Sequence, residues 1–518
     1  MSVKNVIFII IILILTNLLS GCALFQNTEF ELISLNIVDE DGFTIAKIDF
    51  NISNTATIRV IKPNGIVHFS EEYYKGVHTA FAYLDEYRQT PALGNYKIKA
   101  VDKNDNTIFE DDLTFLVSNI TIDDIVEYWW LEEDKHSLVG LKISLRNNGD
   151  LPIYPNKLDV GINNKASSWF FLPTVIMPSQ IEDVYCCLYI NDIPIGNNDI
   201  TINIRNSKEE IIAKKSYVVN PLENTNELKF QWRYMGSREF GLPDVEFLYE
   251  YYHGLERLDT SDYAAYDFSK YDDHLIDLLA YKFQSIYSSS GDVATINFIA
   301  SFVQNIAYVE DTTDCDYPRY PIETLKDRQG DCEDKAILTA SILNSLGYNV
   351  SLIQLPKHVA VGVNLDESAT TDDYFVDEYY YLETTSTGWL LGKIPPEHLG
   401  KTNITIYTLN PRPLLIHSWK NATRYTDSEG SDYIKMKIIV ENLGTKYSGN
   451  FIIEASFFDL NGNIVNQETT SVTSLPAGQK KIVEMSIDVP QGVTTKLKSL
   501  IYLNNKMVHK RESLSNFP

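Results

Sequence analysis

Alternating apolar and polar residues dominate both ends of this 518-residue chain, whereas helical spacing is concentrated in its middle. Segments 46–52 and 95–101 alternate with a period of two, which is the pattern of half-buried strands. Segments 273–280 and 294–304 instead repeat apolar side chains at helical spacing, which predicts helices. The pattern therefore predicts β domains on both sides of a mixed region that begins with helices.

Turn signals divide the β-rich parts into domains. Residues 22–117 contain short strands separated by Asp-Gly and Asn-Gly turns, so we expect a small β-sandwich of immunoglobulin type there. Residues 118–222 and 406–518 share a strand that ends in Asn-x-Gly and a Pro-led turn about 30 residues later: Gly149 with Gly444, and Pro178 with Pro476. We predict two copies of one β-sandwich, serving either as a spacer or as a specific binding module.

A cysteine stands at the start of the last helix predicted in the middle region. Gly330 and Asp331 form a turn that leads into Cys332, and apolar residues then recur at helical spacing up to Gly347, a C-cap glycine. Free N–H groups and the positive end of the helix dipole favour the thiolate, the nucleophilic form of cysteine. Three acidic neighbours of Cys332 oppose it, because nearby negative charge raises a thiol pKa. The cysteine therefore needs a basic partner.

Two predicted strands downstream supply that partner. Residues 358–363 and 379–384 are both β-rich, and an antiparallel hairpin would bring the start of the first strand beside the end of the second. His358 and Glu383 would then lie together. A thiol, an imidazole and a carboxylate that orients it form the Cys-His-acid arrangement of nucleophilic acyl transfer. Cys332, His358 and Glu383 are therefore the candidate catalytic residues.

The sequence around these three residues resembles the transglutaminase-like branch of the papain-type fold. Four motifs carry the resemblance and occur in the family's order: Tyr-Pro-Ile-Glu-Thr-Leu at 320–325, Gly-Asp-Cys-Glu-Asp-Lys-Ala at 330–336, Pro-Lys-His-Val-Ala-Val-Gly-Val at 356–363 and Tyr-Leu-Glu-Thr-Thr at 381–385. They are similar to archaeal transglutaminase-like surface lipoproteins and to bacterial transglutaminase-like cysteine peptidases. Many members of that family carry Asp as the third residue, where this chain has Glu383.

The resemblance implies a fold class and an activity. The chain would be a multidomain protein, with an α+β papain/transglutaminase-like core at 223–405 flanked by immunoglobulin-like β-sandwich domains. Cys332 would attack an amide carbonyl of an extracellular protein or peptide, and no cofactor is expected. Water as acceptor makes a peptidase or amidase, a lysine amine makes a cross-linking enzyme, and the sequence fits both. The rival interpretation is a non-catalytic adhesion or scaffold protein whose cleft binds peptides.

Acyl transfer also requires donors aimed at the oxyanion. The backbone N–H of Cys332 is one candidate. A side-chain donor could be Gln304 or Tyr308, which lie near the end of the second predicted helix. The alternative for both is a packing or capping role.

The N-terminus predicts the location of the protein. An apolar core at 6–15, too short to cross a membrane comfortably, is followed by Leu-Ser-Gly-Cys at 19–22. This ending resembles a lipobox, which implies a lipoprotein signal peptide at 1–21 and lipid on Cys22. An uncleaved N-terminal anchor is the alternative. Both place the chain on the cell surface, membrane-anchored, on the extracellular side.

Composition narrows the partners further. A net charge of −26 argues against nucleic acid, because a polyphosphate would be repelled. The cysteines and histidines show no zinc spacing, and we expect no metal site. An acidic loop at 366–378 lacks the register of a calcium loop, so we interpret it as solvated. The adjacent Cys186 and Cys187 should face opposite sides of a strand, one in the core and one at the surface.

Overall fold

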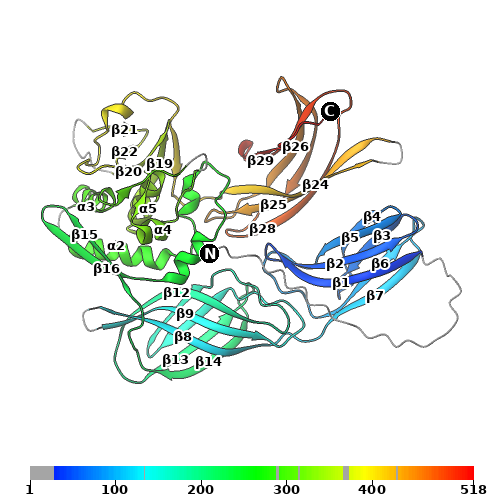
Figure 1. Ribbon diagram of the computed structural model, residues 1–518, viewed down its shortest axis with the longest axis horizontal. Coiled ribbons are helices and arrows are strands. Elements are labelled where there is room, and N and C mark those ends of the chain that lie inside the picture. The colour runs from blue at the N-terminus through cyan, green and yellow to red at the C-terminus, as the bar shows by residue number, and fades with distance from the viewer. Residues whose placement is uncertain are drawn as a thin grey trace. The chain divides into compact units, whose positions relative to one another are not determined.

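The computed structural model describes residues 29–132, 135–287, 291–312, 316–365, 373–426 and 430–517. Within these residues the protein is mostly β, with several sheets and one small helical region (Figure 1). The predicted signal peptide, Cys22, Cys315 and positions 366–372 of the acidic loop lie outside the described residues. None of the described helices combines the length and apolar character needed to cross a membrane.

The first two-sheet unit contains seven strands. They are β1 (Phe30–Glu40), β2 (Phe43–Ile52), β3 (Ala56–Ile61), β4 (Val67–Tyr73), β5 (Gly76–Tyr83), β6 (Gly94–Val101) and β7 (Thr107–Phe115). One sheet has the order β1-β2-β5 and the other the order β4-β3-β6-β7. Most of these residues form a compact body of their own.

The second and third two-sheet units have the strand order of the first. The second contains β8 (Ile120–Glu132), β9 (Lys135–Asn147), β10 (Lys157–Ile162), β11 (Lys165–Phe170), β12 (Ile181–Ile193), β13 (Asn198–Arg205) and β14 (Ile211–Val219). The third contains β24 (Leu415–Thr426), β25 (Asp432–Asn442), β26 (Phe451–Asp459), β27 (Ile464–Val472), β28 (Lys480–Asp488), β29 (Thr495–Leu503) and β30 (Lys506–Glu512). Their sheets are β12-β9-β8 with β11-β10-β13-β14, and β24-β25-β28 with β27-β26-β29-β30.

A buried asparagine explains the Asn-x-Gly landmark shared by the second and third units. Asn442 ends β25, and its Nδ2 donates to Lys446 O at 2.8 Å and Leu475 O at 2.9 Å, while its Oδ1 accepts from Gly444 N. The amide thus ties the end of this strand to the Pro-led turn about 30 residues later, satisfying backbone groups that burial would leave unpaired.

Asn147 makes the matching bonds in the second unit. Its Nδ2 donates to Leu151 O at 2.7 Å and Ile176 O at 2.8 Å. The glycines are required by space, since a Cβ on Gly149 would lie 2.5 Å from Val117 O, and one on Gly444 would lie 2.2 Å from a backbone oxygen. The repeated motif therefore encodes a backbone clamp.

The helical region lies between the second and third units in the chain. Its elements are β15 (Glu227–Arg233), β16 (Ser237–Pro243), α1 (Glu246–His253), α2 (Asp273–Tyr287), α3 (Asp292–Gln304), β17 (Ala307–Tyr308), α4 (Pro321–Asp327), β18 (Gln329–Gly330), α5 (Cys332–Ser345), β19 (Asn349–Leu355), β20 (His358–Asn364), β21 (Phe375–Val376), β22 (Tyr379–Leu382) and β23 (Thr405–Thr408), with 3₁₀ turns at Tyr263–Tyr266 and Pro396–His398. The five-stranded sheet of this region has the order β21-β22-β20-β19-β23.

Helix α5 is the centre of this region. It packs against β19 and β20 on one side and against α2, α3 and α4 elsewhere. Every residue from Glu333 to Leu343 is buried, which explains why its apolar stripes cover more than one face. The helix ends before Gly347, whose φ of +87° suits the glycine expected there.

The two adjacent cysteines correct one prediction. Cys186 and Cys187 do point to opposite faces of β12, but both are buried, at 0% and 5% exposure. Cys186 belongs to the core of the second unit, whereas Cys187 belongs to the core that contains the helices. The prediction of a surface cysteine was wrong because both faces of this strand are covered.

Candidate functional site

The turn before α5 is shaped by Asp334, in the first turn of the helix. Its carboxylate accepts from the backbone N–H of Asp331 at 3.2 Å and of Arg319 at 2.7 Å, and it pairs with the Arg319 guanidinium. A Cβ on Gly330 would lie 2.6 Å from the Cβ of Asp334. Glycine at 330 and aspartate at 334 together therefore hold the turn that presents Cys332 as the first residue of α5.

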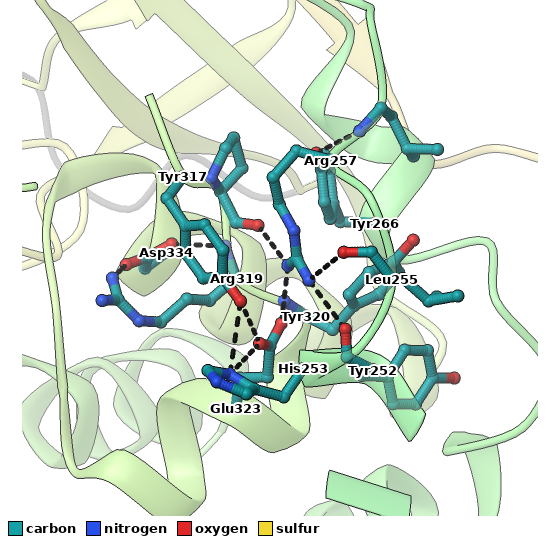
Figure 2. A network of polar contacts seen from close by, with 12 residues as sticks. Tyr252, His253, Leu255, Arg257, Tyr266, Tyr317, Arg319, Tyr320, Glu323 and Asp334 are labelled. Carbon is teal, nitrogen blue, oxygen red and sulfur yellow. Dashed lines mark hydrogen bonds and ion pairs between the residues drawn. The ribbon is translucent and has the colours of Figure 1, made fainter. Parts of the chain in front are cut away.

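The segment leading to this turn is fixed by Glu323, the fully buried acid of the Tyr-Pro-Ile-Glu motif. Its Oε2 accepts from Tyr320 N at 2.9 Å and from Arg257 Nη1 at 2.8 Å, and its Oε1 accepts from the Tyr317 hydroxyl at 2.9 Å. Figure 2 shows the Arg257 guanidinium pointing at this carboxylate. Its Nη2 donates to the backbone carbonyls of Tyr252 and Leu255. The contacts of Glu323 thus explain the Tyr-Pro-Ile-Glu motif by its structural role, without any role in catalysis.

His358 and Glu383 come together as the hairpin prediction requires. Strands β20 and β22 pair antiparallel, and His358 Nε2 lies 3.0 Å from Glu383 Oε2. The same carboxylate accepts four further hydrogen bonds, which come from Tyr381, Thr384 and Thr385. Burial acts to raise the pKa of Glu383, but these hydrogen bonds and the imidazole lower it to about 2. The carboxylate is therefore ionised and can hold the ring in one orientation.

The thiol of Cys332 is held by its neighbour. Cys332 Sγ donates to Glu333 Oε2 at 3.2 Å, so in this structure the thiol proton faces a carboxylate and not the imidazole. Burial raises the pKa of Cys332 well above its ordinary value, and the charges of Glu333 and Asp331 raise it further, whereas a backbone hydrogen bond from Val359 lowers it. Val359 follows His358 on β20, so this contact places the sulfur beside the start of that strand.

A second imidazole, which the sequence did not indicate, stacks on His358. The rings of His358 and His398 are nearly parallel, with centroids 4.1 Å apart and an interplanar angle of 7°. Burial lowers the pKa of His398, and the charge of His358 lowers it further. His398 ends the 3₁₀ turn Pro396–His398, 40 positions after His358. Such a stack limits the rotation of the His358 ring.

The two predicted oxyanion donors differ in their surroundings. Gln304 Nε2 donates to Glu383 O at 2.8 Å and to Trp389 O at 2.9 Å, and its Oε1 accepts from Gly388 N. Its amide hydrogens therefore already hold the chain that follows Glu383. Tyr308 is 47% exposed, and its strand β17 pairs with β18 directly before Cys332. A donor role for either residue stays a prediction.

Lys335 is a buried cation one turn into α5. Its Nζ donates to Ile306 O at 2.9 Å and to Thr385 O at 3.0 Å. Burial lowers the pKa of Lys335 to about 8, although the charge of Glu383 opposes this. The lysine ties α5 to the end of α3 and to the loop that carries Thr385, so it positions Glu383 relative to Cys332.

Within the described residues, three groups of side chains have ligand atoms within 4.8 Å of one another and could hold a metal ion. They are His358, Glu383 and His398; Asp331, Cys332 and Glu333; and Asp311, Asp316 and Glu333. The oxygens of Glu383 are already filled by hydrogen bonds, which makes the first group a poor ligand set. Glu333 Oε1 has no partner among the described residues, and a cation there would offset the charge beside the thiol.

Comparison with known proteins gives distant structural similarity only. No family model and no curated protein matches the chain. A putative cysteine protease from Cytophaga hutchinsonii is 9% identical over 88% of this chain and 100% of that one, with a TM-score of 0.20. The exo-chitosanase CsxA of Amycolatopsis orientalis is 9% identical over 91% of this chain and 76% of its own, with a TM-score of 0.16. A glycoside hydrolase family 2 β-glucuronidase is 10% identical over 91% and 72%, with a TM-score of 0.17.

Proposed function

We propose that the helical region is a transglutaminase-like cysteine acyl-transfer domain of papain-type fold, acting on amides of extracellular proteins or peptides. The observation that carries this proposal is the buried contact of 3.0 Å between His358 Nε2 and Glu383 Oε2. His358 begins β20, which packs against α5, and Glu383 directly follows β22. The four sequence motifs support it, because each folds into the part of this region that supports Cys332 or the His358–Glu383 pair.

The chemistry assigned to each residue follows from its charge state. Because Glu383 is ionised, it keeps a proton on His358 Nε2 and leaves Nδ1 able to accept one. His358 takes the thiol proton of Cys332, and the sulfur attacks the amide carbon. The C–N bond then breaks, the amine leaves with the proton from His358, and water or a lysine amine cleaves the thioester.

A specific contact favours the second candidate, a scaffold whose cleft binds peptides without turnover. The thiol donates to Glu333, and burial with two nearby carboxylates raises its pKa. Catalysis requires the thiol to leave Glu333 and turn to His358. The two candidates therefore differ in whether His358 controls the reactivity of Cys332.

Thiol labelling tests this difference. In purified protein near neutral pH, His358→Ala should slow iodoacetamide labelling of Cys332 on the order of tenfold or more, because the base that accepts the proton is gone. Cys332→Ala identifies the labelled peptide, and the buried Cys186 and Cys187 serve as internal controls. Equal labelling rates with and without His358 would favour the scaffold. Incubation with peptides, with and without an added primary amine, then separates hydrolysis from cross-linking.

The location and the flanking units complete the proposal. We place the chain on the cell surface, anchored by lipid on Cys22, because of the sequence at 6–22. The common strand order of the three two-sheet units supports immunoglobulin-like sandwiches, which would act as spacers for the enzyme. The net charge of −26 suits an exposed surface protein and disfavours nucleic acid.

A further inference from the structure

An acidic pocket lies between the start of α2 and the last turns of α5, away from the first turn of α5 that carries Cys332. It has a volume of about 230 Å³, and its polar lining includes four aspartates and residues of α5: Asp267, Asp272, Asp273, Asp277, Ser341 and Asn344. Asp273 and Asp277 are exposed, and Asp272 forms the buried wall. The pocket therefore gathers oxygen atoms and negative charge at the interface of two helices.

Asp272 shows that the pocket is more than a solvated acidic surface. The residue is 3% exposed, and its Oδ1 accepts from the Tyr252 hydroxyl at 2.7 Å. Its Oδ2 has no hydrogen-bond partner among the described residues. A buried carboxylate oxygen without a partner is costly, so the site has an unmet demand for a donor or a cation.

The surrounding groups do not meet that demand. Ser345 donates to Asp277 at 2.6 Å and Asn344 to Asp267 at 3.3 Å, and neither donor carries a positive charge. The charge of Lys270 acts on Asp273, but within the described residues neither Lys270 nor any other lysine, arginine or histidine forms an ion pair with the four aspartates. The last turn of α5 also carries no basic residue, although its dipole favours a positive charge there.

The donor set identifies the kind of ligand. Carboxylate, hydroxyl and amide oxygens are hard donors, which suit Mg²⁺ and Ca²⁺ and not soft metals. Among the described residues, the pocket aspartates are not among the groups of three acidic or metal-ligating side chains whose atoms converge within 4.8 Å. The ion would therefore keep part of its water shell, and the pocket has room for several waters.

We propose that this pocket binds a partly hydrated divalent cation, Mg²⁺ or Ca²⁺, with Asp272 as its buried ligand. The cation joins α2 to the C-terminal half of α5, and thus stabilises the helix whose first residue is Cys332. The site does not depend on whether Cys332 is catalytic, so its test reads binding and stability without any enzymatic activity.

The test compares the purified full chain with Asp272→Asn after removal of metal by a chelator. Mg²⁺ and Ca²⁺ are added in separate arms, and thermal unfolding and calorimetric titration are recorded. The wild-type protein should unfold at a higher temperature with one or both cations, because a ligand that binds only the folded state stabilises it. Asp272→Asn should lose this shift.

Two control variants locate the effect. Asp292→Asn is matched, because Asp292 lies in the first turn of α3 and also accepts from a tyrosine hydroxyl, Tyr348 at 3.0 Å. It should keep the full response, as should Glu333→Gln, which changes the acidic group beside Cys332. A response that survives in Asp272→Asn, or is lost only in Glu333→Gln, overturns the proposal. So does a wild-type protein that responds to neither cation.

A second variant covers the case in which Asp272→Asn does not fold. Asp277 is exposed at the rim, so Asp277→Asn removes one carboxylate without disturbing the buried wall. It should weaken binding of the preferred cation about tenfold in the calorimetric titration. Unchanged binding in this variant contradicts the proposal.

Discussion

Cys332 is under two opposing influences that come from single residues. The start of α5 offers N–H groups and a positive dipole end, which favour the thiolate. Burial raises the pKa of Cys332, and Glu333, which accepts a hydrogen bond from the thiol, raises it further. The second influence is the stronger one in this structure, because burial and the carboxylates act in the same direction.

Replacing Glu333 should therefore increase the reactivity of the thiol. Glu333→Gln replaces the carboxyl group that accepts from the thiol, which lowers the pKa of Cys332. Burial and Asp331 raise the pKa of Glu333 itself to about 10, so the effect of its charge grows as the pH approaches that value. The rate of iodoacetamide labelling should rise above the wild-type rate, most clearly toward pH 10, on the order of tenfold for each unit by which the pKa of Cys332 falls. A profile of the labelling rate against pH measures this shift directly.

Glu310→Gln is the matched control, because Glu310 is an exposed acid in the same region. It should leave the profile of Cys332 nearly unchanged. If Glu333→Gln labels at the wild-type rate, Glu333 does not hold the thiol in solution.

The same residues show what sequence reasoning could reach. The approach of His358 to Glu383 followed from the geometry of an antiparallel hairpin, and Cys332 does begin its helix. The stack of His398 on His358 joins positions with no regular spacing, so only the tertiary fold reveals it. The bonds from Gln304 to Glu383 and Trp389 were hidden for the same reason. The sequence did indicate that the charge of Glu333 opposes the thiolate, but it could not show that this side chain accepts a hydrogen bond from the thiol.

At the level of elements, the turn after β25 is the clearest link between a short motif and stability. Asn442→Ala would leave the backbone N–H groups of Leu414 and Gly444 without their acceptor, in a position that is 0% exposed. We expect a loss of about 3 kcal/mol in the third unit, from at least two unsatisfied backbone groups. Hydrogen exchange measured over β24–β30 of the full chain should report this loss locally.

Asn461→Ala provides the comparison, because Asn461 lies in the exposed turn between β26 and β27. Its substitution should change local stability by less than about 0.5 kcal/mol. Similar exchange in the two variants would show that the Asn442 clamp contributes little.

The two-sheet units also mark the limit of prediction at this scale. The landmarks at Gly149 and Gly444 led to the expected pair of repeats, and both ranges have the same strand order. The first unit has that order too, but its sequence lacks the Asn-x-Gly landmark of the other two. Many different sequences can form the same order of paired strands, so a shared topology need not leave a shared motif. The Asn-x-Gly clamp requires particular residues and is therefore visible in the sequence.

At the scale of the whole molecule, the third unit has a core that is separate from the core of the helices. The third unit has its own cluster around Ile453, Phe457 and Ile501, whereas the helices share a larger core around Phe298 and Ile337. Cores that share few residues open independently, so damage to one should not spread to the other. The candidate site should thus depend on the helical core alone.

Paired truncations of phenylalanine test this independence. Phe457 and Phe298 are both 0% exposed, and each substitution by Ala should destabilise its own unit by about 3–5 kcal/mol. Phe457→Ala should speed hydrogen exchange in β24–β30 and leave the labelling rate of Cys332 unchanged. Phe298→Ala should speed exchange in α3 and α5 and alter Cys332 labelling, because Phe298 packs in the core that supports α5. A change in Cys332 labelling caused by Phe457→Ala would mean that the units are coupled, and the third unit would then be part of the machinery that holds the thiol.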